Sequence, residues 1–66
     1  MLITKKHFAG EYERTDGRNV VRVYFEDCLG GWIAAAKWDR LRYSDPMSTK
    51  QKAIRTADRM LFNAGH

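Results

Sequence analysis

The segment Trp-Ile-Ala-Ala-Ala-Lys-Trp, residues 32–38, restricts the fold more than any other part of the chain. If it forms a strand, its even positions share one face of a sheet: Trp32, Ala34, Ala36 and Trp38. Its odd positions share the other face: Ile33, Ala35 and Lys37. Two large rings on either side of two methyl groups form a shallow trough. This pattern predicts a central strand with a helix packed closely against it.

A chain of 66 residues has room for one domain, with one small sheet and one helix. Residues 1–6 pass from an apolar start to two lysines, which fits either a loose arm or an edge strand. The single cysteine, Cys28, excludes an intramolecular disulfide. A reducing, cytoplasmic setting fits a single cysteine best. Because the N-terminus becomes polar within four residues, we expect neither a signal peptide nor a membrane-spanning segment.

Residues 7–13 alternate between apolar and polar side chains, and the pair Asp16-Gly17 separates them from a second alternating run, residues 19–26. An Asp-Gly pair in this position predicts a hairpin with a two-residue type I′ turn. Counting outward from this turn pairs apolar with apolar residues and opposite charges with each other: Tyr12 with Val21, Gly10 with Val23, Phe8 with Phe25, Glu11 with Arg22, and His7 with Glu26.

The segment 27–30 predicts a four-residue turn into the tryptophan strand, with Phe25 opposite Trp32 and Val23 opposite Ala34. One sheet face is then apolar: Phe8, Tyr12, Val21, Val23, Phe25, Trp32, Ala34, Ala36 and Trp38. The other face mixes charged, aromatic and aliphatic side chains: His7, Glu11, Val20, Arg22, Tyr24, Ile33, Ala35 and Lys37. Such a mixture fits either a binding surface or a tolerant solvated face.

Ser44-Asp45-Pro46 ends the strand, and Ser48 to Gln51 is typical of a helix capping box with Ser48 as N-cap. An apolar stripe follows at spacings of three and four, with Gly65 as C-terminal cap: Ile54, Ala57, Met60, Leu61 and Ala64. The opposite side carries a basic ridge: Lys52, Arg55 and Arg59. The predicted fold is α+β, three antiparallel strands followed by one C-terminal helix packed on one face.

The net charge of +4 is unevenly distributed, because residues 1–36 carry five groups of each sign and residues 37–66 carry seven basic and three acidic groups. A basic half suggests a polyanionic partner, of which nucleic acid is the commonest. An excess of about four charges is also usual for solubility alone.

A hairpin, a Gly-Gly-Trp-Ile-Ala-Ala-Ala-Lys strand, Arg40-Leu41-Arg42 and Ser-Thr-Lys-Gln-Lys-Ala-Ile-Arg-Thr-Ala-Asp-Arg follow one another over residues 17–60. This order resembles AP2-like domains and the N-terminal arm-binding domains of phage-type integrases. The resemblance implies that the sheet face away from the helix enters the major groove of DNA. It implies groove-facing Arg22, Tyr24 and Lys37, with phosphate contacts at the rim from Arg14, Arg18, Arg40 and Arg42.

These observations predict a non-enzymatic nucleic-acid-binding accessory protein of phage or mobile-element type, with DNA favoured over RNA, and without metal or cofactor. Tight binding would require a homodimer or a partner protein. The alternative is a stoichiometric inhibitor or adaptor that binds a protein of a nucleic-acid-handling complex, and the chain resembles anti-CRISPR proteins in size. Its contact would be the apolar outer patch: Tyr24, Ile33, Ala35 and Tyr43.

Overall fold

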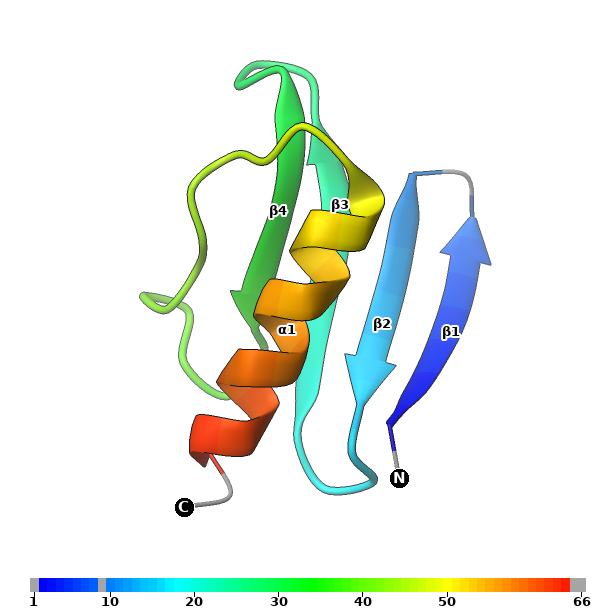
Figure 1. The fold of residues 1–66 in the computed structure, drawn as a ribbon, viewed down its shortest axis with the longest axis vertical. Helices are drawn as coiled ribbons and strands as arrows, with labels where there is room; N and C mark the ends of the chain where they lie inside the picture. The colour runs from blue at the N-terminus through cyan, green and yellow to red at the C-terminus, as the bar shows by residue number, and fades with distance from the viewer. Residues whose placement is uncertain (1, 9, 65–66) are drawn as a thin grey trace.

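The computed structural model describes residues 2–8 and 10–64 of the chain. The elements are β1 (Ile3–Phe8), β2 (Glu11–Thr15), β3 (Val20–Glu26), β4 (Gly31–Ala36) and α1 (Lys50–Ala64). The strands form one antiparallel sheet in the order β1-β2-β3-β4, and α1 lies across one face of it (Figure 1). The predicted α+β class is confirmed, but the sheet has four strands rather than three.

The fourth strand arises because the run that was expected to form one strand from His7 onward is divided at Gly10. Gly10 has a φ of +84°, which an L side chain rarely adopts, and it lies in the turn between β1 and β2. Of the two possibilities for residues 1–6, the edge strand is therefore the one observed. The predicted pairing of Phe8 with Phe25 is wrong, because Phe8 pairs with Glu11. The pairing of His7 with Glu26 fails for the same reason, since β1 pairs with β2.

The β2–β3 register differs by two residues from the one predicted, because Tyr12 lies opposite Val23 and Glu13 opposite Arg22. The loop contains four residues, 16–19, and Asp16 lacks the positive φ that a type I′ turn requires. Instead, the Asp16 Oδ1 accepts the backbone N–H groups of Arg18 and Asn19, both at 2.9 Å. A shift of two residues does not change the face of the sheet to which alternation assigns each side chain.

The turn between β3 and β4 agrees with the prediction, with residues 27–30 in the loop and Phe25 opposite Trp32. The Glu26 carbonyl accepts N–H groups from Leu29 and Gly30, and Gly30 has a φ of +68°. Strand β4 ends at Ala36 rather than Trp38, and the Trp38 side chain is 39% exposed. Trp38 therefore does not form the second wall of the predicted trough.

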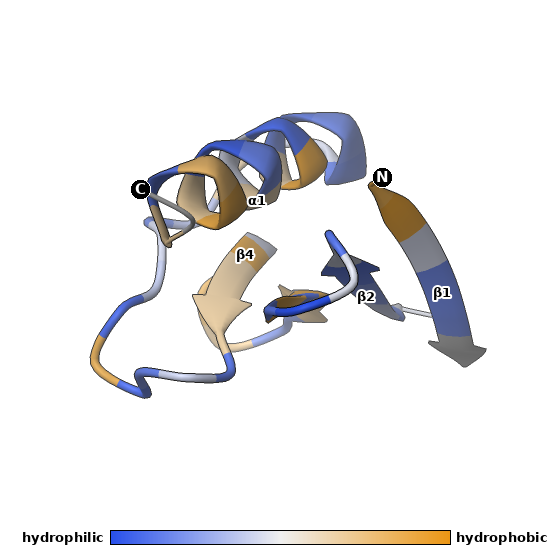
Figure 2. Ribbon diagram, turned by 90° about the horizontal axis from the view of Figure 1, so that it is seen from below, coloured by the Kyte–Doolittle hydropathy of each residue, from blue (hydrophilic) through white to orange (hydrophobic). Residues whose placement is uncertain are grey.

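The core lies between α1 and the inner faces of β3 and β4, and Figure 2 shows orange and tan ribbon segments in both α1 and β4. Its fully buried members are Val21, Val23, Ala34, Ala53, Ala57 and Leu61. Small side chains from both layers allow the helix backbone to approach the sheet closely. The buried stripe is Ala53, Ala57 and Leu61, flanked by Ile54 and Met60, whereas Ala64 is exposed. The stripe is thus rotated slightly from the one predicted.

The helix begins one residue later than the predicted capping box implies. Thr49, not Ser48, is the N-cap, because its Oγ1 accepts the Lys52 N–H at 3.2 Å. The C-terminal cap expected at Gly65 lies outside the described residues.

The segment 42–47 covers the outer edge of β4, although it is too irregular to form a strand. Trp32 and Met47 exchange both backbone hydrogen bonds at 2.8 Å, and Ser44 donates its N–H to the Ala34 carbonyl at 2.8 Å. The Ala36 N–H reaches the Arg42 carbonyl at 2.9 Å. These bonds satisfy the backbone groups of β4 and fix the path of the connection to α1.

Candidate nucleic-acid interface

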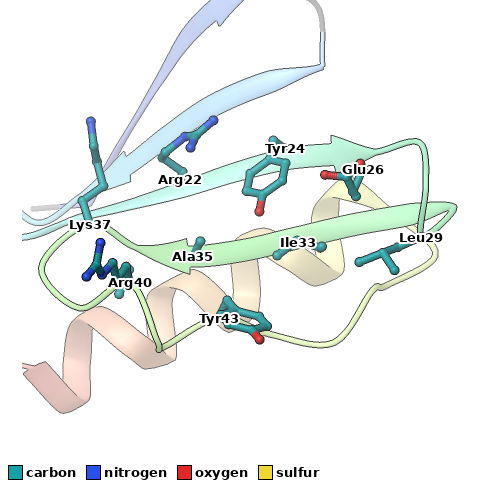
Figure 3. A pocket seen from close by; sticks show the side chains of 10 residues that line it. Arg22, Tyr24, Glu26, Leu29, Ile33, Ala35, Lys37, Arg40 and Tyr43 are labelled. Atoms are coloured by element: carbon teal, nitrogen blue, oxygen red, sulfur yellow. The ribbon is translucent and has the colours of Figure 1, made fainter.

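The sheet face opposite α1 contains a shallow hollow of about 500 Å³, which we call the outer groove (Figure 3). Its floor is formed by Ile33 and Ala35 of β4, and Tyr24 of β3 and Tyr43 of the 42–47 segment lie on its two sides. The complete lining is Arg22, Tyr24, Glu26, Leu29, Ile33, Ala35, Ala36, Lys37, Arg40 and Tyr43.

Strand alternation and the edge segment together position these side chains. Arg22, Tyr24 and Glu26 occupy alternate positions of β3 and therefore share the face away from the helix. Tyr43 forms an antiparallel bridge with Ala35, which sets its ring beside the floor of the groove. The groove thus combines residues of the sheet with one residue from a connection whose path is fixed by backbone hydrogen bonds.

The cations lie towards one end of the groove and Glu26 and Leu29 at the other (Figure 3). Arg22 contacts the Glu11 carboxylate at 2.7 Å, and its guanidinium carbon lies 4.9 Å from the centre of the Tyr24 ring. The Lys37 Nζ lies 2.8 Å from the Glu13 Oε2. Glutamates of β2 therefore partly neutralise two of the three cations and hold them in place.

Arg40 differs from the other two cations of the groove. Its side chain is exposed, and within the described part of the chain it has no ion-pair partner. Because an unpaired guanidinium keeps all its donors available, Arg40 is the group best able to bind an incoming anion.

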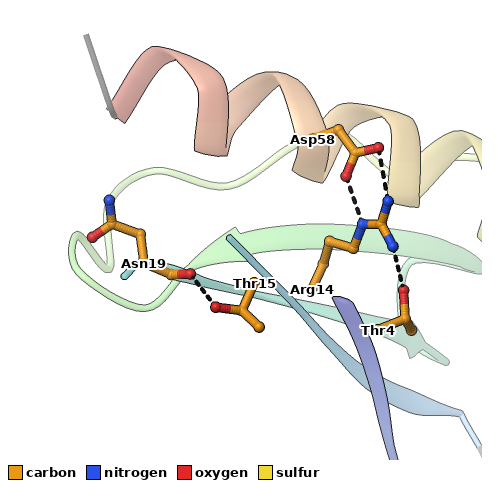
Figure 4. A network of polar contacts seen from close by, with 5 residues as sticks. All are labelled: Thr4, Arg14, Thr15, Asn19 and Asp58. Carbon is orange, nitrogen blue, oxygen red and sulfur yellow. Dashed lines mark hydrogen bonds and ion pairs between the residues drawn. The ribbon is translucent and has the colours of Figure 1, made fainter. Parts of the chain in front are cut away.

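Arg14 lies elsewhere, so its predicted place at the rim of the outer face is wrong. Its Nε and Nη2 contact the two Asp58 carboxylate oxygens of α1 at 2.7 and 3.3 Å, and its Nη1 donates to the Thr4 hydroxyl at 2.7 Å (Figure 4). Arg14 lies two residues after Tyr12 on β2, so alternation places both side chains on the sheet face that packs against the helix.

Two other predicted rim residues, Arg18 and Arg42, are exposed but do not line the groove. Arg18 lies in the β2–β3 turn, beside a second hollow of about 300 Å³ that it shares with Lys37 and Trp38. Arg42 lies 4.0 Å from the Asp39 carboxylate, a separation at which an exposed pair is weak.

The basic ridge of Lys52, Arg55 and Arg59 is exposed along α1, as predicted. It lies on the opposite side of the sheet from the outer groove (Figures 1 and 3). Lys52 contacts the Ser48 hydroxyl at 3.2 Å, and the Lys50 Nζ lies 4.4 Å from the centre of the Tyr12 ring. The ridge and the groove are therefore separate candidate surfaces.

Sequence reasoning did not include Tyr43, Glu26 and Leu29 among the nucleic-acid contacts. Tyr43 was assigned only to an apolar patch, because nothing in the sequence indicates that residues 42–47 return along β4. The sequence did contain a signal for Glu26 and Leu29. Glu26 lies an even number of residues from Arg22 on β3 and so shares its face, and Leu29 lies in the turn that follows Glu26.

Among residues 2–8 and 10–64, no three His, Cys, Asp or Glu side chains are grouped so as to hold a metal ion. Cys28 is exposed in the β3–β4 turn. The described part of α1 is not long and apolar enough to cross a membrane. No protein family, curated protein or solved structure matches the chain.

Proposed function

We propose that this protein is a small non-enzymatic nucleic-acid-binding accessory protein of phage or mobile-element type, and that it binds through the outer groove. One observation supports this proposal above all. Four residues expected to contact nucleic acid, Arg22, Tyr24, Lys37 and Arg40, line the same hollow with a second tyrosine opposite the first. Cations beside aromatic rings can bind phosphates and bases together.

The two ion pairs determine what kind of binding to expect. A phosphate that contacts Arg22 or Lys37 has to compete with Glu11 or Glu13. Affinity should therefore be modest and depend strongly on salt, with nonspecific dissociation constants of roughly 10⁻⁴ to 10⁻⁶ M at physiological salt. Stronger binding would come from a partner protein or a second copy of the chain, which adds contacts.

The proposal is tested by fluorescence anisotropy with labelled DNA and RNA of the same length over a series of salt concentrations. Arg40→Ala should lower affinity and reduce the slope of log K against log salt by about 1, as expected for one lost phosphate contact. Arg55→Ala, on the helix ridge, is the matched control and should change neither. Absence of binding to both polymers at low salt would overturn the proposal. Loss of binding only with Arg55→Ala would assign the contact to the ridge.

A protein-binding inhibitor or adaptor is the second candidate. It is favoured by the pairing of Arg22 and Lys37 with glutamates and by the exposed apolar rim, where Tyr43 is 65% and Leu29 58% exposed. Its test is affinity capture from cells of the natural host. A stoichiometric partner retained by the wild type and lost with Tyr24→Ala would favour this function. The absence of such a partner would count against it.

A further inference from the structure

The depth of the outer groove bears on which form of nucleic acid it can hold. Ile33 at its floor is 3% exposed, whereas Tyr43 beside it is 65% exposed, so the flanking ring is far more accessible than the floor. A sheet that reads duplex DNA has to project into a major groove about 12 Å wide. Here Tyr24 and Tyr43 flank the β3–β4 surface (Figure 3), so a duplex would meet these rings before the floor.

The groove is large enough to admit an unpaired base, and its lining suits one. Its volume of about 500 Å³ lies within the range of roughly 300 to 1,000 Å³ that is typical of small organic ligands. Tyr24 and Tyr43 face it from opposite sides, and Ile33 and Ala35 provide an apolar floor (Figure 3). An unstacked base offers its two π faces to such a site, whereas a paired base in a helix offers neither face.

The charges give the bound nucleotide a direction. A phosphate is attracted to the end with Lys37 and unpaired Arg40, and it is repelled by Glu26 at the other end. Arg22, held by Glu11, lies over one face of the Tyr24 ring, so a base that stacks on Tyr24 has to use the other face. The base therefore lies between the tyrosines, with its phosphate at the Lys37 and Arg40 end.

We propose that the outer groove binds single-stranded nucleic acid by holding one unpaired base between Tyr24 and Tyr43 and the adjacent phosphate at Arg40 and Lys37. This inference rests on the proposed function and specifies its ligand. It differs from the insertion into a DNA major groove that the AP2-like and integrase resemblance implies.

The experiment compares three labelled oligonucleotides of equal length in fluorescence anisotropy at low salt: a single strand, its duplex, and a single strand with abasic positions throughout. The single strand should bind at least about fivefold more tightly than either of the others, because loss of a stacked base removes roughly a 5- to 150-fold factor. Tyr43→Ala should weaken single-strand binding within the same range, and Tyr43→Phe should retain it. Because the Tyr43 side chain is largely exposed, Tyr43→Ala should leave the fold intact, which circular dichroism checks.

The possible failures are distinguishable. If none of the three oligonucleotides binds, the proposed function itself is overturned. If the duplex or the abasic strand binds as tightly as the intact single strand, nucleic-acid binding stands but stacking in the groove is refuted. The same refutation follows if Tyr43→Ala, folded as judged by circular dichroism, binds the single strand as the wild type does.

Discussion

Gly31 shows how one position without a side chain lets the edge segment pack against β4. A Cβ atom built there would lie 2.8 Å from the Pro46 Cβ and 3.1 Å from the Met47 carbonyl oxygen. Neither atom is at the end of a flexible side chain, and Met47 is bonded to Trp32 through its backbone. We expect Gly31→Ala to lower the free energy of unfolding by about 1 to 3 kcal/mol, the usual cost of overpacking, as measured by urea unfolding.

The neighbouring glycine provides the control for this prediction. Gly30 has a φ of +68° and open space around it, so Gly30→Asn should be tolerated, since asparagine adopts this conformation more readily than other residues. Equal destabilisation by the two substitutions would mean that general rigidity of the turn, and not contact with Pro46, explains the loss at Gly31.

Asp16 should make the β2–β3 turn sensitive to acid. The N–H groups of Asn19 and Arg18 donate to its carboxylate and hold its pKa below the ordinary value of 3.8. A group with a lowered folded-state pKa stabilises the fold fully above its unfolded pKa, and this contribution is lost as pH falls through the folded pKa. Asp16→Ala should therefore destabilise the protein at pH 7 and by less below pH 3.8, as urea midpoints of both proteins at each pH would measure. A difference that does not change with pH would contradict this role.

At the scale of elements, Arg14 joins three parts of the fold. It extends from β2 to Asp58 of α1 through two hydrogen bonds and to Thr4 of β1 through a third (Figure 4). Its side chain is 19% exposed, so the pair is screened less than a surface pair. A double-mutant cycle with Arg14→Gln and Asp58→Asn should give a coupling energy of about 1 kcal/mol in urea unfolding.

The control cycle uses Arg42 and Asp39, whose closest atoms are 4.0 Å apart and whose side chains are 53% and 45% exposed. Its coupling energy should be no more than about 0.3 kcal/mol. Equal coupling in the two cycles would show that burial and bidentate geometry add nothing at Arg14.

The sequence predicted the β3–β4 hairpin and the helix well because their signals are local. The turn at residues 27–30 ends in Gly30, Gly31 follows as the first residue of β4, and Ala57 and Leu61 repeat at the helical period. The prediction of a single strand from His7 onward failed at Gly10. The apolar–polar alternation continues through this residue, although the chain reverses direction there. The hairpin register failed because the Asp16 side chain forms a wider turn than Asp-Gly suggests.

The candidate site was predicted from strand alternation. A register error of two residues does not change the face on which a side chain lies. The outward positions of Arg22, Tyr24 and Lys37 were therefore predicted correctly although the register of β2 and β3 was not. Tyr43 was the harder residue. Its place beside Ala35 depends on backbone bonds between β4 and an irregular segment, and these leave no periodic signal in the sequence.

At the scale of the whole molecule, the two edges of the sheet differ in whether another segment covers them. The edge of β4 is covered by residues 42–47, whereas β1 has no neighbour on its outer side among the described residues. An uncovered strand offers unpaired N–H and C=O groups to another chain, and charged side chains discourage such pairing. Lys5 and Lys6 are exposed at the middle of β1, so we infer that they oppose edge-to-edge association.

Replacing both lysines should therefore convert this edge into a pairing surface. We expect the variant with Lys5→Val and Lys6→Thr to self-associate in sedimentation velocity at concentrations where the wild type is monomeric, because the strand loses two charges and gains β propensity. The variant with Lys52→Ala and Arg55→Ala loses the same charge from exposed helix positions and should remain monomeric. If both variants associate equally, reduced net charge is the cause. If the β1 variant stays monomeric, the lysines do not protect the edge.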